Sequence, residues 1–379
     1  MSPTRRSFLA ASAAAPLSLA AKGKTSRVYF GTYTRNGSKG IYTATLDTAS
    51  GKLSEPELAA EIPSPSFVTL HPNGKFLYAV SEMGGAPTKP TGTVTAFSLD
   101  AASGKLNKLN TVSTKGEAPC HLNVDKTGRA LVLVNYSSGS TACMPVRADG
   151  SLGEAASFIE HKGSSVNQQR QRSPHAHSAN ISFNNRFVVV ADLGTDQVLV
   201  YKLDPATATL TPNDPPFVKV KPGGGPRHFT FHPKGKYGYV INEMGSAVTA
   251  FTWDANKGVF NEIQHISTLP DGFKGVNNCA EVVAHPNGKF LYGSNRGHNS
   301  LAVFKIDGQG KLTAAGHVPT GGEIPRNFAI APGGKWLLAA NQNTNNVVVF
   351  AVDPNSGNLT PTGQQVKVGA PVCIRYLAL

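Results

Sequence analysis

Several short polar motifs of the chain contain arginine, glutamate or histidine side chains that could act on a carbonyl group. Four of them are His177, Arg227, Glu243 and Arg296. Guanidinium groups bind anions and oxygen atoms that gain negative charge during a reaction. A carboxylate beside such cations stays ionised, and an imidazole with an ordinary pKa of about 6.5 exchanges protons readily, so either group can activate water. These residue types predict a site for a small anionic molecule, with acid–base chemistry at hand.

Other kinds of chemical site find less support. The chain contains neither a Gly-x-Ser-x-Gly motif nor a His-Glu-x-x-His motif. His175 and His177 alternate on an expected strand without an obvious carboxylate partner, so we expect no metal and no cofactor. The cysteines lack Cys-x-x-Cys spacing, and we expect buried free thiols rather than zinc ligands or disulfides. They are Cys120, Cys143, Cys279 and Cys373.

The composition limits the class of protein. Of the 379 residues 40% are apolar, which suffices for a core and argues against disorder. No run of about 18 apolar residues is present, so we expect no stable membrane insertion. The net charge of +13 suggests nucleic-acid binding at first, but the basic residues are scattered along the chain. A mildly basic surface or an anion site explains the charge better, and we expect no nucleic-acid partner.

Residues 1–26 resemble an export signal. Arg5, Arg6, Phe8 and Leu9 precede an alanine-rich stretch that runs to Ala21. Paired arginines before a weakly apolar tail are typical of a twin-arginine signal. The segment therefore predicts a periplasmic or secreted protein that the twin-arginine export machinery recognises. The alternative is a frayed basic terminus. The sequence does not predict whether the signal is cleaved, nor the oligomeric state.

The elements that position the chemical residues follow from an internal repeat. Each copy is a strand-like run, a turn such as His-Pro-Asn-Gly-Lys and a second strand-like run, after which two more strands follow. The turns are centred on Gly74, Gly128, Asn185, Gly235, Gly288 and Gly334, 46 to 57 residues apart. Glycine and asparagine tolerate the positive φ of a tight hairpin turn. Units of this length with four strands each are typical of β-propeller blades.

Residues 27–379 are predicted to form one all-β domain, a seven-bladed β-propeller of four-stranded blades. Six complete units leave strands over 27–33 and 40–47 without a first strand, and leave a strand over 373–379 without successors. Joined, these ends make a seventh blade, so the C-terminal strand closes the ring in the N-terminal blade. Closure removes free sheet edges. A row of separate two-sheet domains, the alternative, leaves both ends unpaired.

The blade register predicts that polar residues gather at one mouth of the central channel. Positions at a fixed offset from each turn form rings, and the three polar rings are expected to share one face. Their members include Glu82, His121, His177, Arg227, His228, Glu243, Arg296, Arg326, Asn327 and Gln342. We expect these side chains to bind or transform a ligand, although a structural channel lining that holds water or chloride is the simpler alternative.

At these residues the sequence resembles the 6-phosphogluconolactonase-type family of seven-bladed propeller lactonases, which includes the fungal carboxymuconate-cyclising enzymes. The resemblance spans residues 27–379. It is carried by Pro174–Asn180, Gly225–His228, Ile241–Glu243, Ser294–Gly297 and Pro325–Asn327. It implies a metal-independent lactonase that opens a sugar-acid lactone to the hydroxy acid, either 6-phosphogluconolactone or an unphosphorylated relative.

The resemblance also implies roles for individual residues. The family's catalytic set of one histidine, two arginines and one glutamate matches His177, Arg227, Arg296 and Glu243. In the implied mechanism Glu243 or His177 activates water, and the arginines bind the oxyanion and an acidic group of the lactone. Substrate contacts are expected from His175, which competes for the histidine role, and from His121, His228, Arg326, Asn327, Glu82 and Gln342. An exported enzyme would not meet cytosolic 6-phosphogluconolactone, which favours an unphosphorylated lactone.

Three alternatives stay open at the level of sequence. The same residues would serve a carboxymuconate-type cycloisomerase that forms a lactone. A secreted propeller could bind a ligand without catalysis. Glu82 and Glu243 share the rim, so a calcium-dependent lactonase is a further alternative.

Overall fold

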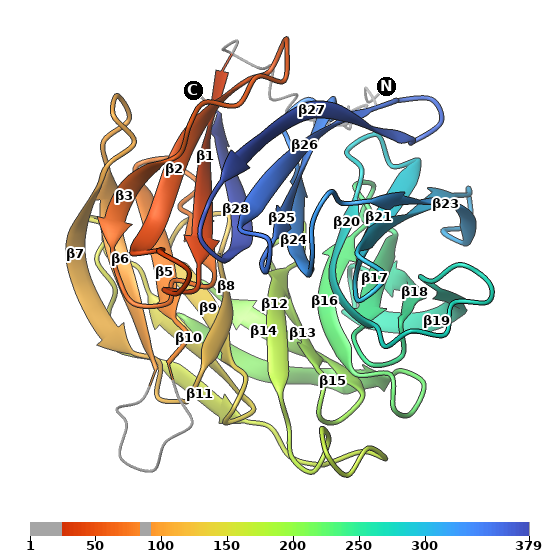
Figure 1. Cartoon of the computed structure of the whole chain (residues 1–379). Helices are drawn as coiled ribbons and strands as arrows, with labels where there is room; N and C mark the ends of the chain where they lie inside the picture. Colours follow the sequence, from red (N-terminus) through yellow and green to blue (C-terminus); the bar gives the residue numbers. More distant parts are fainter. Residues whose placement is uncertain (1–24, 84–91, 379) are drawn as a thin grey trace, which may run out of the picture.

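A computed structural model describes residues 25–83 and 92–378, which form seven four-stranded antiparallel sheets around a central axis (Figure 1). No helix occurs among these residues, and hence none that could span a bilayer. The prediction of an all-β, seven-bladed propeller is confirmed. The segment 1–24, with the paired arginines of the export signal, lies outside the described residues, and the first strand already begins at Thr25.

The blades follow one another along the chain, and only the first combines both ends of it. That blade consists of β28 (Pro371–Ala378), β1 (Thr25–Thr32), β2 (Gly40–Asp47) and β3 (Glu57–Glu61). The next two contain β4 (Val68–Leu70), β5 (Phe76–Ser81), β6 (Thr93–Leu99) and β7 (Leu106–Ser113), then β8 (Pro119–Val124), β9 (Ala130–Asn135), β10 (Ser140–Pro145) and β11 (Ser157–Glu160).

The remaining four blades repeat the same strand order. The fourth and fifth contain β12 (Ala176–Ile181), β13 (Phe187–Asp192), β14 (Gln197–Asp204) and β15 (Thr209–Lys219), then β16 (Pro226–Phe231), β17 (Tyr237–Asn242), β18 (Ala247–Asp254) and β19 (Val259–Ser267). The last two contain β20 (Asn278–Ala284), β21 (Phe290–Arg296), β22 (Ser300–Ile306) and β23 (Leu312–Pro319), then β24 (Pro325–Ile330), β25 (Trp336–Asn341), β26 (Asn346–Val352) and β27 (Leu359–Lys367).

The ring closes as the sequence predicts. β1 pairs antiparallel with β28, in a register that runs from Ser26 opposite Ala378 to Thr32 opposite Pro371. The first strands of all seven blades contact one another in a closed circle. At the hairpin turn after each of these strands from β4 onward, glycine or Asn185 adopts the expected positive φ, between 60° and 76°. Neither end of the chain is therefore left as an exposed sheet edge.

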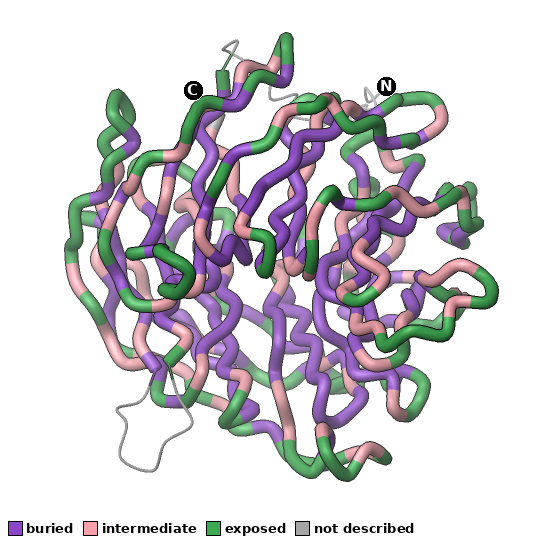
Figure 2. The backbone as a smooth tube through the Cα atoms, viewed as in Figure 1, coloured by how far each residue is buried: buried purple, intermediate pink, exposed green. Residues whose placement is uncertain are grey.

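The core lies between the blades, while the outermost strands face solvent (Figure 2). Every residue of β9 and β13 is buried, because both faces of a middle strand pack against neighbouring blades. β7, in contrast, buries only its first residue, Leu106, and leaves the others exposed or partly exposed. All four cysteines are buried and free, as expected. The buried middle strands give the inner strands a rigid frame.

A β-bulge interrupts six of the seven inner strands near their start, all but β4, and this feature was not predicted. The antiparallel register shifts between Pro119 and His121 in β8, and the corresponding shift recurs in β12, β16, β20, β24 and β28. A bulge bends its strand and re-aims the side chain of the extra residue. Among the residues at the bulges are Cys120, His177, Arg227, Arg326 and Val372, and all five of these line one cavity of the channel.

Candidate active site

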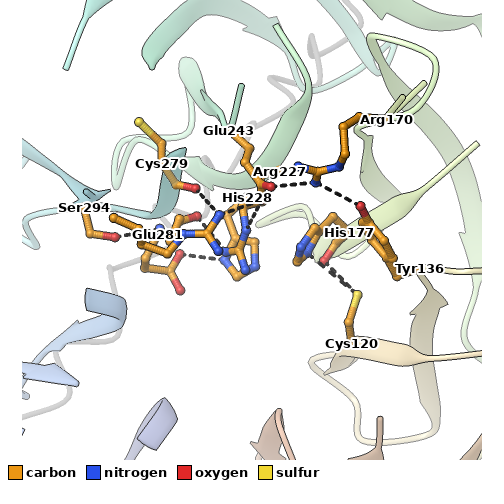
Figure 3. A network of polar contacts seen from close by, with 12 residues as sticks. Cys120, Tyr136, Arg170, His177, Arg227, His228, Glu243, Cys279, Glu281 and Ser294 are labelled. Atoms are coloured by element: carbon orange, nitrogen blue, oxygen red, sulfur yellow. Dashed lines mark hydrogen bonds and ion pairs between the residues drawn. The ribbon is translucent and has the colours of Figure 1, made fainter. Parts of the chain in front are cut away.

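A single buried carboxylate, that of Glu243, pairs with three arginines at one mouth of the channel. Figure 3 labels Glu243 and two of these arginines, Arg170 and Arg227. Glu243 Oε2 accepts a hydrogen bond from Arg227 Nε at 2.9 Å and pairs with Arg296 Nη2 at 2.8 Å. Arg170 Nη2 donates to Glu243 Oε1 at 2.8 Å. Both carboxylate oxygens are therefore occupied by guanidinium groups.

Four different elements bring these side chains together. Arg227 stands at the bulge of β16, Glu243 directly follows β17, and Arg296 ends β21. The structure thus joins three of the residues predicted to be catalytic. Arg170 was missed, because it belongs to the irregular segment between β11 and β12, where no repeat assigns a register.

Electrostatics fixes the charge state of this cluster. Burial alone would raise the pKa of the Glu243 carboxyl, but the charges of Arg296 and Arg227 and the hydrogen bond from Arg170 outweigh burial and lower the pKa to about 2. Burial lowers the pKa of Arg296 to about 10, against the attraction of Glu243. All three arginines and the glutamate are therefore charged at neutral pH.

A narrow cavity lies beside the cluster, below the mouth. It has a volume of about 10 Å³, which suits about one water molecule. Its lining comprises Ser66, Phe67, Glu82, Cys120, His177, Arg227, His228, Arg326 and Val372. Members of all three sequence-derived rings therefore meet around one small space, although His121, Glu243, Arg296, Asn327 and Gln342 are not in its lining.

His177 is the buried imidazole of this cavity. Its Nδ1 lies 3.7 Å from Cys120 Sγ, and its ring meets that of Tyr136 edge to face, with centroids 5.2 Å apart. Burial, reinforced by the charge of Arg227, lowers its pKa well below 6.5. The ring is therefore neutral at pH 7 and able to accept a proton.

His175, its competitor for the catalytic role, is placed differently. It is only partly buried, stacks on Tyr136 with ring centroids 4.7 Å apart, and has Nδ1 2.9 Å from the Tyr136 carbonyl oxygen. It does not line the cavity that holds His177 and Arg227. Its position is that of a wall of the site.

Arg326 and Glu82 face the same cavity from the blades next to the closure. The Arg326 guanidinium lies 5.4 Å from the centre of the Tyr33 ring, and no hydrogen bond joins it to any residue that the structure describes. The Tyr33 hydroxyl lies 3.0 Å from each oxygen of Glu82. Arg326 is thus a cation with unused donors beside the space for water. Tyr33, like Arg170, is a part of the site that the sequence did not reveal.

His121, His228 and Asn327, predicted to touch substrate, lie deeper in the channel. His228 Nδ1 is 2.9 Å from Glu281 Oε1, and the Asn327 amide donates to the other Glu281 oxygen. The rings of Phe67, His121, His177 and His228 contact one another, with the closest centroids, those of Phe67 and His121, 4.1 Å apart. We call these four rings the ring cluster.

The ring cluster separates the narrow cavity from a second one at the hairpin end of the inner strands. This cavity has a volume of about 380 Å³ and is lined by His121, His228, Glu281 and Arg375, among others. Gln342 is buried near the mouth, where its amide nitrogen donates to Asn343. The structure therefore does not bring His121, Asn327 and Gln342 into contact with the arginine cluster.

No group of three or more histidine, cysteine or carboxylate side chains within residues 25–83 and 92–378 is arranged to hold a metal ion. The two carboxylates that share the rim already have partners. Glu82 accepts a hydrogen bond from the Tyr33 hydroxyl, and Glu243 forms ion pairs with the arginines.

Comparison with known proteins agrees with this architecture. A family model described as a lactonase with a seven-bladed β-propeller matches residues 27–376. The 6-phosphogluconolactonase of Bacillus subtilis is 38% identical over 350 residues, which cover 92% of this chain and 97% of the relative. A 6-phosphogluconolactonase of Formosa agariphila is 36% identical, with 80% of this chain and 86% of the relative covered.

A solved structure shows the same likeness in three dimensions. The periplasmic gluconolactonase of Pseudomonas aeruginosa superimposes with a TM-score of 0.88 at 36% identity, over 93% of this chain and 99% of that one. Fold, family model and relatives agree along nearly the whole propeller. The chain belongs to the seven-bladed β-propeller lactonases, hydrolases that act on a cyclic carboxylic ester.

Proposed function

We propose that the protein hydrolyses a sugar-acid lactone at the arginine-lined mouth, without a metal, and that His177 activates the water. The observation that carries this proposal is the neutral imidazole of His177 in a water-sized cavity beside Arg227 and Arg326. The relatives named above act on 6-phosphogluconolactone or gluconolactone by name, which supports a lactone of this class.

In the proposed reaction His177 accepts a proton from water as the water oxygen bonds to the lactone carbonyl carbon. The carbonyl oxygen becomes an oxyanion, which the free donors of Arg326 and Arg227 stabilise. The bond between this carbon and the ring oxygen then breaks, and the proton on His177 passes to the departing oxygen. The product is the open hydroxy acid.

Glu243 has a different role in this proposal. A carboxylate with a pKa of about 2 is a poor base at neutral pH, and both of its oxygens are occupied. Its charge keeps Arg227 and Arg296 in place, so we assign it the positioning of the cations. Of the two candidate bases, the imidazole fits the task better.

Export is part of the proposal. The twin-arginine-type segment would deliver the folded enzyme to the periplasm or beyond, and the Pseudomonas aeruginosa relative is named as periplasmic. A lactone outside the cytoplasm would then be the substrate. Fusion of residues 1–26 to a reporter that requires twin-arginine export tests this part, and replacement of both Arg5 and Arg6 by lysine should abolish transport. A reporter that still crosses the membrane without the arginine pair contradicts it.

The enzymatic part is tested by acid release from gluconolactone and a panel of other lactones, after subtraction of the uncatalysed rate. We expect His177→Asn to lower kcat by about 10²-fold or more and His175→Asn by less than about tenfold. Arg227→Ala should lower kcat/KM, and EDTA should leave the wild-type rate unchanged. Wild-type rates equal to those of the His177 and Arg227 variants on every lactone would overturn the proposal, and loss of activity in EDTA would favour the calcium alternative.

A further inference from the structure

We propose that Arg170 binds an anionic substituent of the lactone and exchanges its contact with Glu243 for that group. This inference rests on the proposed lactonase function and deepens it, since it names the class of substrate. The ligand would carry a phosphate or a second carboxylate at a distance from the reacting carbonyl. Arg170 would then be a specificity-determining residue of the site.

Arg170 is the one arginine on Glu243 that faces outward. Its side chain is 40% exposed, whereas those of Arg227 and Arg296 are 2% and 11% exposed. One nitrogen, Nη2, makes both of its contacts, to Glu243 Oε1 at 2.8 Å and to the Tyr136 hydroxyl at 3.2 Å. No described residue accepts a hydrogen bond from Nε or Nη1. These free donors can form the bidentate fork that phosphate and carboxylate groups favour.

The charge of the mouth fits such a ligand. In the Glu243 cluster and the narrow cavity together, the four arginines Arg170, Arg227, Arg296 and Arg326 stand against the two carboxylates Glu82 and Glu243, an excess of two positive charges. The Arg170 side of its pair with Glu243 is 40% exposed, and Glu243 keeps Arg227 and Arg296 as partners when Arg170 moves away, so this contact can be exchanged without leaving an unpaired buried charge. The buried contacts of Arg227 and Arg296 cannot be exchanged in this way, because their separation would leave unpaired charges inside the protein.

The backbone beneath Arg170 is anchored, so the exchange needs only a side-chain movement. The next residue, Gln171, is buried and donates from Nε2 to the Leu193 carbonyl and to Asp196 Oδ1, both at 2.8 Å. Its Oε1 accepts the Asn167 N–H at 3.1 Å. The segment therefore presents the guanidinium from a fixed point at the rim.

Binding of the anion would also change Glu243. Departure of Arg170 removes one hydrogen bond that holds the Glu243 pKa down and leaves Oε1 without a partner. Oε1 then becomes an acceptor for a hydroxyl of the bound sugar, while Oε2 still holds Arg227 and Arg296. An anionic lactone would thus complete its own site, and a neutral lactone would leave Arg170 on Glu243.

Binding of reaction products gives the first test, because it does not depend on turnover. Calorimetry is carried out with gluconate, 6-phosphogluconate and glucarate, which differ in the group remote from the carboxylate formed by hydrolysis. We expect at least one of the two doubly acidic products to bind wild type about tenfold more tightly than gluconate. A preference confined to 6-phosphogluconate supports a phosphate substituent, and a preference that includes glucarate supports a carboxylate.

The matched variants are Arg170→Gln and Arg172→Gln. Arg172 lies two residues along the same segment, is exposed and has no described partner. Arg170→Gln should reduce the preference to about twofold or less, and Arg172→Gln should retain it. Equal affinity of wild type for all three products, or an equal loss for all three in Arg170→Gln, overturns the proposal.

Kinetics separates the two proposals. In Arg170→Gln the ratio of kcat/KM for 6-phosphogluconolactone to that for gluconolactone should fall about tenfold. If wild type hydrolyses neither lactone nor any other in the panel, the proposed function fails, while the product affinities still decide the role of Arg170. If wild type is active but the ratio is the same in Arg170→Gln, the lactonase stands and the role of Arg170 is wrong. Equal melting temperatures of the variants confirm that each is folded.

Discussion

In the proposed mechanism Glu243 and His177 have different roles because their surroundings differ. Three guanidinium groups keep Glu243 ionised and occupied, whereas burial beside Arg227 keeps His177 neutral. Both pKa values are lowered, that of Glu243 by the arginines against burial and that of His177 by burial, so at pH 7 the carboxylate is charged and the imidazole is neutral. This difference supports the proposed roles, in which Glu243 positions the arginines and His177 accepts and donates the proton.

The pH dependence of the reaction follows from His177. Burial disfavours the imidazolium, so the pKa lies below 6.5 and the reactive neutral form predominates at pH 7. We expect kcat/KM to be level from about pH 7 to about pH 8 and to fall on acidification, with the midpoint of the fall below about pH 6.5. Initial rates of lactone opening, corrected for spontaneous hydrolysis, measure this profile. A midpoint above pH 7, or an unchanged acid limb in His177→Asn, would speak against His177 as the base.

At the scale of single residues, the internal repeat made part of the site predictable. Arg227, Glu243 and Arg296 occupy fixed offsets from their turns, so counting from Gly235 and Gly288 sufficed to bring them together. Arg170 and Tyr33 lie in segments that the repeat does not number. The sequence also did not predict how deep in the channel a side chain lies. His228 is adjacent to Arg227 in the chain, yet its side chain contacts Glu281 and not Glu243.

At the scale of elements, the bulges decide which side chains reach the cavity. An uninterrupted strand would alternate its side chains between the two faces of the blade. The extra residue at the start of β12 and β16 instead directs His177 and Arg227 into the channel. The internal repeat predicted these strands but not their bulges, because a single extra residue near the start of a strand leaves the recurring turn and the strand-like run intact.

Two loops of the mouth depend on one buried carboxylate, Asp196. Its Oδ1 accepts hydrogen bonds from Gln171 Nε2 at 2.8 Å and from Gly225 N at 2.7 Å. Its Oδ2 accepts from Ser165 at 2.5 Å and from Gly223 N at 2.7 Å. The Gly225 carbonyl in turn accepts the N–H of Glu243. Asp196 thus links the segment of Arg170 to the segment that positions Arg227 and Glu243.

Asp196→Asn should therefore impair catalysis more than stability. The amide leaves two buried donors without an acceptor, which costs about 2 kcal/mol of the free energy of unfolding, and loosens both loops. We expect kcat/KM to fall about tenfold or more. Steady-state kinetics and denaturant unfolding measure the two effects.

Asp125→Asn is the control for this substitution. Asp125 is equally buried and accepts hydrogen bonds from Thr127, Arg129 and Ala130, but it belongs to a hairpin turn remote from the mouth. It should lose similar stability with an unchanged kcat. Equal losses of kcat in the two variants would show that Asp196 contributes to stability alone.

At the scale of the whole molecule, closure by β28 holds the blades in register around the mouth. β28 supplies the inner strand of the first blade, and its Cys373 and Ile374 are fully buried. The ends of the chain revealed this closure in the sequence, since the N-terminal segment carried the later strands of a blade and the C-terminal segment carried a first strand. The number of blades and their order were therefore predictable, whereas the width of the central cavity was not, because it depends on side-chain packing.

Deletion of residues 371–379 should abolish the cooperative fold. It exposes the edge of β1 and opens the core between the first blade and its neighbours. We expect loss of a cooperative thermal transition and association through the open edge, measured by circular dichroism and size-exclusion chromatography. Deletion of Leu379 alone, which lies beyond β28, serves as the control and should melt like wild type. A truncated protein that melts at the wild-type temperature would contradict the structural role of closure.

The ring cluster limits the passage of a ligand along the channel. Phe67, His177 and His228 line the narrow cavity and His121 and His228 line the second one, so a lactone bound at the arginines, as proposed, would have to displace these contacting rings to reach the hairpin end. The hydroxy acid would then leave through the mouth by which the lactone entered. It carries a new carboxylate past the same arginines, so product and substrate would compete for the same mouth of the channel. Turnover would then slow as product accumulates, and the rate would depend on how quickly the surroundings remove it.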